Sequence, residues 1–308
     1  MRRFHVLLAV LVAAIWGINF VVIDAGLDHF PPLLFVALRF TFVAFPAVYL
    51  VARPQVGFRW VLIIGTFLGV GQFGFLFVGI DRGMPAGLAS LVLQAQALFT
   101  VLFAVALLHE RPRGRQLAGI AIGALGLAVI ALGRASAVPL LAVMLTLAAA
   151  ASWGVANIAT RVARPRNGLR LVVWSSLVPP VPLAVLSLVF EGYDEDRAAL
   201  AHLDFAGVAA LAYIVVFASL VGYGIWNTLL HRYPASTVAP FSLLVPVVGI
   251  AAAWLWLGEV PGVAELIGAV AVLVGVLVLS TTPPGAAVAT ASPQSAAAQA
   301  QAAATTPG

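Results

Sequence analysis

Hydrophobic residues gather in ten long runs along the chain, and short polar segments separate them. A helix needs about 20 mostly apolar residues to cross a bilayer, which is the approximate length of these runs. The pattern predicts an all-α integral membrane protein with ten transmembrane helices, at about residues 6–26, 32–52, 58–80, 85–108, 115–133, 138–161, 169–190, 205–230, 235–257 and 262–280.

The composition agrees with this class of protein. The chain is 63% hydrophobic and 9% charged, whereas soluble domains have about 25% charged residues. There is no cysteine, which excludes disulfides and thiolate chemistry. The five histidines lie at membrane edges or in loops, with no pair at metal-ligand spacing, so we expect no metal and no cofactor.

The positive charge predicts the orientation of the chain. A net charge of +5 could suit nucleic acid, but basic cytoplasmic loops explain it better, so we expect no nucleic-acid partner. With the N-terminus inside, twelve of the sixteen arginines fall on the cytoplasmic side and three (Arg82, Arg134, Arg197) outside, while Arg39 lies within the membrane. We therefore expect a multi-pass protein with both termini in the cytoplasm. The first run has no signal-peptide cleavage site and should be retained.

The two halves of the chain resemble each other. A shift of 149 residues aligns several pairs: Pro85 with Pro234, Glu110 with Glu259, Pro112 with Pro261, Gly119 with Gly268, and Gly126 with Gly275. Five helices per half is an odd number, so the second half should be inverted relative to the first, as in many transporters. We predict one five-helix repeat over residues 1–134, an inverted repeat over 135–280 and a disordered cytoplasmic tail over 281–308, since the tail is Ala/Thr/Pro/Gln-rich and uncharged.

Several segments resemble a known family, among them WGINFVVI, GMPAGLASLVLQAQA, VGYGIWNTLLHRY and PFSLLVPVVG. Over about residues 5 to 280 the chain is similar to the EamA family of the drug/metabolite transporter superfamily, and within it to bacterial exporters of O-acetylserine and cysteine. The resemblance implies two inverted five-helix halves and export of small amino acids across the inner membrane, with the amino acid and the membrane lipid as partners. Coupling to protons is left open, because no membrane carboxylate stands out as its carrier.

Arg39 is the only charge deep within a hydrophobic run. Charged residues inside a membrane are functional candidates, and this one could attract the carboxylate of an amino acid. The alternative is a structural pair with Asp24, Asp81 or helix carbonyl groups.

Five amides within the runs could line a substrate site, because an amide offers both donors and acceptors to a zwitterion. They are Asn19, Gln72, Gln94, Gln96 and Asn157. Amides also hold membrane helices together, so each has a structural alternative. Gln94 and Gln96 should face different surroundings on one helix, and we expect Gln94 to line the path.

The eighth run has a polar stripe, in which Ser219, Tyr223 and Asn227 follow at four-residue spacing and Trp226 lies beside them. Residues four apart share a helix face, so the stripe is expected to line a cavity.

In the ninth run, Pro240 and Pro246 would free the carbonyls of Ser236 and Ser242. This break could be a hinge and a substrate contact, or an ordinary kink in a packing helix.

Glu110 and Glu259 each precede a proline and the start of the next helix. A carboxylate is stabilised near a helix N-terminus, so we interpret both as structural turn residues.

Competing functions are export of other amino acids or of cationic drugs, and a lipid-modifying membrane enzyme. Drug export usually needs a membrane carboxylate, and an enzyme needs an acid/base or metal constellation; the sequence offers neither convincingly.

Overall fold

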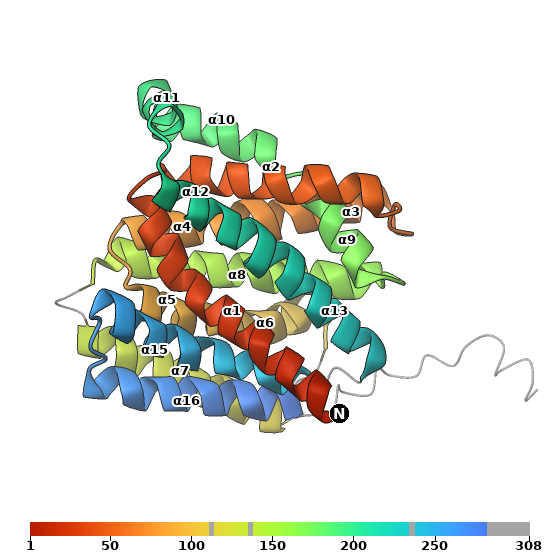
Figure 1. The fold of residues 1–308 in the computed structure, drawn as a ribbon. Coiled ribbons are helices and arrows are strands. Elements are labelled where there is room, and N and C mark those ends of the chain that lie inside the picture. The colour runs from red at the N-terminus through yellow and green to blue at the C-terminus, as the bar shows by residue number, and fades with distance from the viewer. Residues whose placement is uncertain (111–113, 135–137, 234–237, 282–308) are drawn as a thin grey trace, which may run out of the picture.

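The computed structural model describes residues 1–110, 114–134, 138–233 and 238–281, and all regular structure in these ranges is helical (Figure 1). Each predicted run is found, as far as it is described, as one helix or a series of helical segments, which confirms the all-α class. The segments are α1 (Arg3–Leu27), α2 (Pro32–Leu50), α3 (Phe58–Ile64), η1 (Gly65–Phe73), α4 (Gly74–Asp81), α5 (Ala86–Val92), η2 (Leu93–Ala95), α6 (Gln96–Leu108), α7 (Gly114–Arg134), α8 (Leu140–Ala163), α9 (Gly168–Ser175), α10 (Pro180–Phe190), α11 (Tyr193–Ala201), α12 (Phe205–Ala212), η3 (Tyr213–Val221), α13 (Gly222–Arg232), η4 (Ala239–Leu243), α15 (Leu244–Leu257) and α16 (Val263–Thr281).

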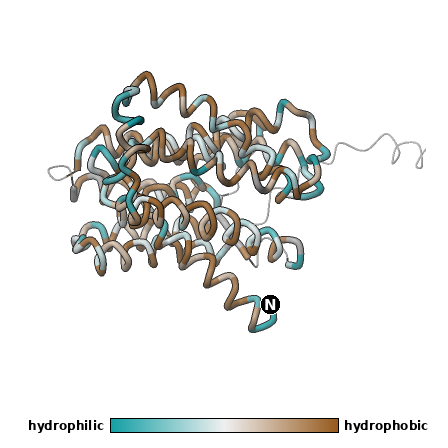
Figure 2. Tube along the Cα trace, turned by 45° about the horizontal axis from the view of Figure 1, so that its top comes forward, coloured by the Kyte–Doolittle hydropathy of each residue, from teal (hydrophilic) through white to brown (hydrophobic). Residues whose placement is uncertain are grey.

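The helices are long and apolar enough for a membrane. Among the described residues, eight helices or continuous series meet the length and hydropathy of a crossing, and Gly114–Ile130 and Val263–Val278 form two shorter apolar helices. Hydrophobic residues cover most of the helices, and hydrophilic residues gather mainly at helix ends (Figure 2). This is the distribution that a bilayer imposes on a multi-pass protein.

The helices that are not regular α-helices occur at matching places in the two halves. η1 and η3 are π-helical, and an offset of 148 residues carries both ends of η1 onto the ends of η3. The 3₁₀ segments η2 and η4 follow in the next helix of each half. Segments of π-helix are rare and often mark functional sites, so the repetition directs attention to η1 and η3.

α7 and α16 pack together along one side of the molecule through glycines. A Cβ atom on Gly126 would lie 2.8 Å from the carbonyl oxygen of Gly268, and one on Gly275 would lie 2.7 Å from that of Gly119. These are the residues that the repeat pairs, and they meet crosswise because the two helices run antiparallel. Only glycine permits so close an approach of two backbones.

The two repeated glutamates bind groups outside the helices that follow them. Glu259 accepts hydrogen bonds from the N–H groups of Ala86 (2.8 Å) and Gly87 (3.0 Å), at the start of α5. Glu110 instead binds Arg161 on α8, at 2.6 and 3.1 Å. Glu259 therefore does place a carboxylate at a helix N-terminus, as the structural interpretation assumed. The helix is α5, however, and not the helix that follows Glu259 in the chain.

Two features of the seventh run and the loop after it went unpredicted. The run divides into α9 and α10, because Pro179 and Pro180 cannot donate the N–H groups that would continue α9. The acidic loop then forms the short helix α11, whose first turn contains Asp194, Glu195 and Asp196. Acidic residues are favoured in a first turn by the helix dipole.

Some predictions fall outside the described residues. They concern the tail beyond Thr281 and the positions of Arg111, Pro112, Arg113, Pro234, Ala235 and Ser236. The boundaries of the two repeats stay a prediction.

Candidate functional site

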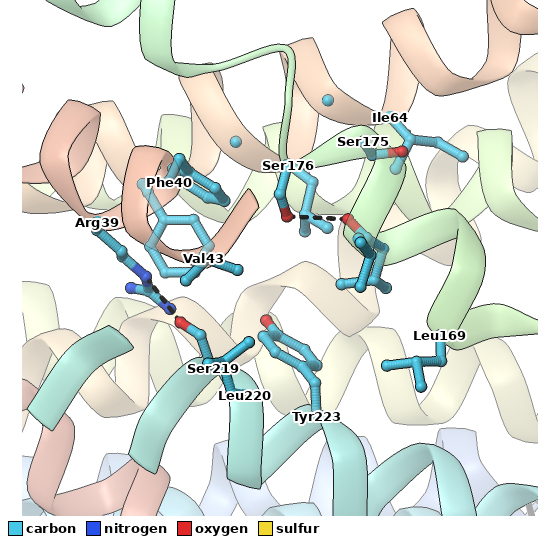
Figure 3. Close-up of a pocket in the computed structure, with 16 residues that line it drawn as sticks. Arg39, Phe40, Val43, Ile64, Leu169, Ser175, Ser176, Ser219, Leu220 and Tyr223 are labelled. Carbon is cyan, nitrogen blue, oxygen red and sulfur yellow. Dashed lines mark hydrogen bonds between the residues drawn. The ribbon is translucent and has the colours of Figure 1, made fainter. Parts of the chain in front are cut away.

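A small, partly open cavity lies between α2, the α3–η1 series, α9 and the η3–α13 series (Figure 3). It measures about 50 Å³, which is room for a few water molecules. Its walls are mostly apolar, and its polar side chains are few. They are Arg39 on α2, Ser175 and Ser176 at the end of α9, Ser219 in η3 and Tyr223 in α13. We refer to this cavity as the Arg39 pocket.

Arg39 is almost completely buried, with 3% of its surface exposed. Its Nε donates a hydrogen bond to the hydroxyl of Ser219 at 3.2 Å. Its guanidinium carbon lies 3.9 Å from the ring centroid of Phe73 and 5.7 Å from that of Phe40. Aromatic faces attract a cation at such distances, so two rings and one hydroxyl stabilise the buried charge.

This environment leaves part of the guanidinium group without a partner. The Nη1 atom of Arg39 is buried and makes no hydrogen bond. No described carboxylate lies within ion-pair distance of Arg39, and Asp81, one of the alternatives from sequence, pairs with Arg82 instead. An uncompensated buried charge is costly, and an anionic group in the pocket would lower that cost.

Ser219 and Tyr223 are the part of the predicted polar stripe that reaches the pocket. The Ser219 hydroxyl accepts from Arg39 and donates to the carbonyl of Ile214, five residues earlier, at 2.7 Å. This side-chain bond runs back over one turn of the π-helix. The hydroxyl of Tyr223 points toward the space between α2 and α9 in Figure 3.

The rest of the stripe packs elsewhere. The amide of Asn227 donates to the carbonyl of Tyr223 in its own helix at 2.8 Å, and its oxygen lies against Gly168 at the start of α9. The Trp226 ring packs against Trp16, with ring centroids 5.3 Å apart. Tyr223 and Asn227 both lie in α13 and share a helix face, but Asn227 lies one turn further along and contacts the start of α9 instead of the pocket.

Gln96 and Asn157 join two helices. The Asn157 side chain on α8 donates to the Gln96 side-chain oxygen at 2.8 Å and to the Thr100 hydroxyl at 3.1 Å. Thr100 in turn donates to the backbone carbonyl of Gln96 at 2.7 Å. Neither amide lines the Arg39 pocket, and both have the geometry of a helix–helix contact.

Asn19, Gln72 and Gln94 are buried, with 8%, 3% and 6% of their surfaces exposed. The side-chain oxygens of Asn19 and Gln72 accept no hydrogen bond from the described residues. None of the three lines the Arg39 pocket. Their possible role in the path therefore stays a prediction.

The break in the ninth run lies at η4. Pro240 is the second residue of this 3₁₀ segment, and Pro246 lies in the first turn of α15, where its missing N–H breaks few bonds. Ser242 lies within η4 and is partly buried. The carbonyl of Ser236, which Pro240 was expected to free, is outside the described residues.

Sequence reasoning missed Ser175, Ser176 and Phe73. The Ser176 hydroxyl donates to the carbonyl of Val172 at 2.9 Å, and the hydroxyl of Ser175 is buried without a partner. The available signal was the pair of serines before Pro179 and Pro180, since prolines interrupt a helix and leave groups near them unbonded. The cation–π contact of Phe73 had no signal, because it depends on how α2 meets η1.

The described residues contain no group of three His, Cys, Asp or Glu side chains that could hold a metal ion. The pocket offers one positive charge, three serine hydroxyls and a tyrosine within apolar walls. Such an arrangement can bind a small molecule with an anionic end.

Comparison with known proteins identifies the family. The EamA-like transporter family model matches residues 3–132 and again residues 140–281. The chain belongs to the EamA-like transporter family. It is therefore a multi-pass membrane transporter, and each of the two matches covers about one half of the chain.

Relatives of this transporter cover almost its whole length. It is 46% identical to a protein of Salmonella typhimurium and 45% identical to one of Escherichia coli, both named as probable amino-acid metabolite efflux pumps; each match covers 90% of this chain and 95% of the relative. A Streptantibioticus cattleyicolor protein named as a probable terminal-alkyne amino-acid exporter is 29% identical over 88% of the chain and 91% of its own length. A crystal structure with 23% identity shares the fold, with a TM-score of 0.62 over 91% of this chain and 99% of that one.

Proposed function

We propose that this EamA-family transporter exports small amino-acid metabolites, with O-acetylserine and cysteine as the first candidates, from the cytoplasm across the bacterial inner membrane. The proposal is supported by two relatives at 45% and 46% identity that are named as probable amino-acid metabolite efflux pumps. A third relative, at 29%, is named as an amino-acid exporter.

The observation that carries the proposal is the unpartnered Nη1 of Arg39 in the pocket. A guanidinium group binds carboxylates through parallel hydrogen bonds, so the α-carboxylate of an amino acid would take the place beside Arg39. Oxygen atoms of Tyr223 and Ser176 are then available to the ammonium group. The apolar wall formed by Val43, Ile64 and Val173 suits a short, uncharged side chain.

Alternating access accounts for the small size of the cavity. At about 50 Å³ the Arg39 pocket holds a few waters, so it must widen before an amino acid can enter. We assign this conformation to a contracted state between substrate loading and substrate release. In the proposed orientation, both termini of the chain lie in the cytoplasm.

Export of cationic drugs is the second candidate, and the pocket argues against it. The described lining of the pocket contains a positive charge and neither Asp nor Glu. A cation would therefore meet a like charge without a counter-ion.

Efflux from cells tests the proposal. Cells that overproduce the transporter and run an active serine-to-cysteine pathway should release O-acetylserine and cysteine selectively over a panel of other amino acids. Arg39→Ala should reduce this release about tenfold or more, because charge-assisted hydrogen bonds contribute about 1.5 to 3 kcal/mol. Arg39→Lys should give an intermediate loss, since it keeps the charge without the fork.

The matched control is Arg59→Ala, which removes an exposed arginine beside Trp60. Membrane levels of all variants are measured by immunoblot. Unchanged release by Arg39→Ala at normal membrane level would refute the carboxylate contact.

A further inference from the structure

A second, larger cavity opens beside the helices that form the Arg39 pocket. It measures about 930 Å³ and lies between the start of α2, the η1–α4 series, α10 and α11. Its lining is largely apolar and includes Gly71, Gly74 and Leu186, and it also contains charges of both signs, among them Asp81 and Arg82. We refer to this cavity as the outer groove, because the predicted orientation places it on the outer side.

Three helices line both cavities, each at a different point along its length. The paired positions, groove first and pocket second, are Leu33 and Arg39 on α2, Val78 and Gly65 on the α3–α4 series, and Leu183 and Ser176 on the α9–α10 series. The groove positions all lie toward the predicted outer ends and the pocket positions toward the predicted inner ends. The two cavities therefore follow each other along one axis of the bundle.

One tight contact lies between them. A Cβ atom on Gly69 would overlap Cγ of Pro179, so the proline ring rests on the bare backbone of η1. One turn earlier, a Cβ on Gly65 would lie 2.6 Å from the carbonyl oxygen of Ser175. On these two helices, the lining residues before this contact belong to the pocket and those after it belong to the groove, except that Phe73 still lines the pocket.

Both sides of the contact lie outside regular α-helix. Gly69 lies in the π-helical η1, and Pro179 lies in the break between α9 and α10. The prolines of the break already lack the N–H groups of a helical ladder. Each helix can therefore bend at this contact with little loss of regular α-helical hydrogen bonding.

We propose that the Arg39 pocket and the outer groove are two halves of one substrate path, and that the contact of Pro179 with Gly69 is the barrier that closes it. This inference rests on the proposed function, since it takes the Arg39 pocket as the substrate site. The charges of both signs that line the groove suit a hydrated zwitterion that leaves the pocket. An acyl chain of a lipid is the alternative occupant.

The absence of cysteine allows a direct test by thiol labelling. Ser176→Cys places a thiol in the pocket, Val78→Cys places one in the groove, and Val185→Cys on the exposed face of α10 is the lipid-facing control. Each protein, in right-side-out and in inside-out vesicles, is treated with a methanethiosulfonate reagent that cannot penetrate membranes. We expect Val78→Cys to react from the outside, and Ser176→Cys to react from the outside much more slowly than from the inside.

Two variants then open the barrier in opposite ways. Pro179→Ala removes the ring from Gly69, and Gly69→Ala pushes the two segments apart with a methyl group. In either background, Ser176→Cys should react from the outside at least several times faster than before. Pro182→Ala, a proline of α10 outside both cavities, is the matched control and should leave the outside labelling rate of Ser176→Cys unchanged.

The proposal is overturned if Pro179→Ala and Gly69→Ala both leave the outside labelling rate of Ser176→Cys unchanged while the proteins remain monodisperse. It is also overturned if Val78→Cys reacts only with a membrane-permeant reagent, because the groove is then filled by lipid. Labelling needs no transported substrate. Normal export by Arg39→Ala would refute the carboxylate contact without changing the labelling result. A negative labelling result would refute the barrier without bearing on the contact between Arg39 and the carboxylate.

Discussion

At the scale of single residues, Arg39 combines burial with incomplete pairing. Two aromatic rings and the Ser219 hydroxyl stabilise its charge, and Nη1 has no partner. The sequence could single out Arg39 because a charge in a hydrophobic run is rare. It could not identify Phe73 or Ser219 as partners, because both lie on other helices and reach Arg39 only through the fold.

Gln96 and Asn157 provide a residue-scale test of a structural contact. Asn157→Ala and Gln96→Ala should each lower the thermal unfolding temperature of the detergent-purified protein, because each removes the same interhelical hydrogen bond. The double variant should be little worse than the stronger single one, with a coupling free energy of about 0.6 to 2 kcal/mol.

Thr228→Ala is the control, since its exposed hydroxyl bonds only within its own helix. Additive effects of Gln96→Ala and Asn157→Ala would show that the two amides act separately. The hydrogen bond between them would then contribute nothing to stability.

At the scale of elements, the irregular helices were the least predictable part of the structure. Hydrophobic periodicity reports which face of a helix is buried, but long apolar runs are apolar on all faces and conceal a π-turn. This is why η1 and η3 were not expected, although their positions repeat. The interruption of α9 and α10 was within reach, since two adjacent prolines rarely continue a helix.

The first turn of α2 depends on a half-buried glutamate, Glu191. Its carboxylate accepts from the N–H groups of Leu33 (2.7 Å) and Leu34 (3.2 Å), and the Ser187 hydroxyl lies 2.5 Å from it and 2.7 Å from a carboxylate oxygen of Asp196. Burial raises the pKa of Glu191, and the nearby charge of Asp196 adds to this; the hydrogen bonds from Ser187, Leu33 and Leu34 oppose it without cancelling it.

A raised pKa means that the folded protein binds this proton more tightly than the unfolded chain does. The contribution of Glu191 to stability is therefore complete below the ordinary pKa of a glutamate and is lost as pH rises through the raised value. Glu191→Gln cannot ionise. We expect its unfolding temperature, relative to the wild type, to rise as pH increases from below the ordinary glutamate pKa to neutrality.

Thermal unfolding of both proteins across this pH range measures the difference. Glu195→Gln, which neutralises an exposed carboxylate of the same loop, should show a nearly constant difference. A constant difference for Glu191→Gln as well would contradict the assigned pKa shift.

At the scale of the whole molecule, the sequence predicted the class of fold and most of the helices. Run lengths follow from bilayer thickness, and the repeat-related glycines of α7 and α16 meet as antiparallel partners. Contacts between distant elements were out of reach. Glu259 at the start of α5 and the position of Pro179 on Gly69 depend on how the helices pack, which no local pattern records.

The central claim is that Arg39 binds the carboxylate of an exported amino acid, and exchange in proteoliposomes tests it most directly. Vesicles with the purified protein are loaded with unlabelled cysteine or O-acetylserine, and uptake of the labelled compound is followed for the wild type, Arg39→Ala and Arg59→Ala. The account predicts rapid exchange by the wild type and Arg59→Ala, a loss of about tenfold or more in Arg39→Ala, and no inhibition by the decarboxylated amine of cysteine. Equal exchange by Arg39→Ala, or strong competition by that amine, would contradict it.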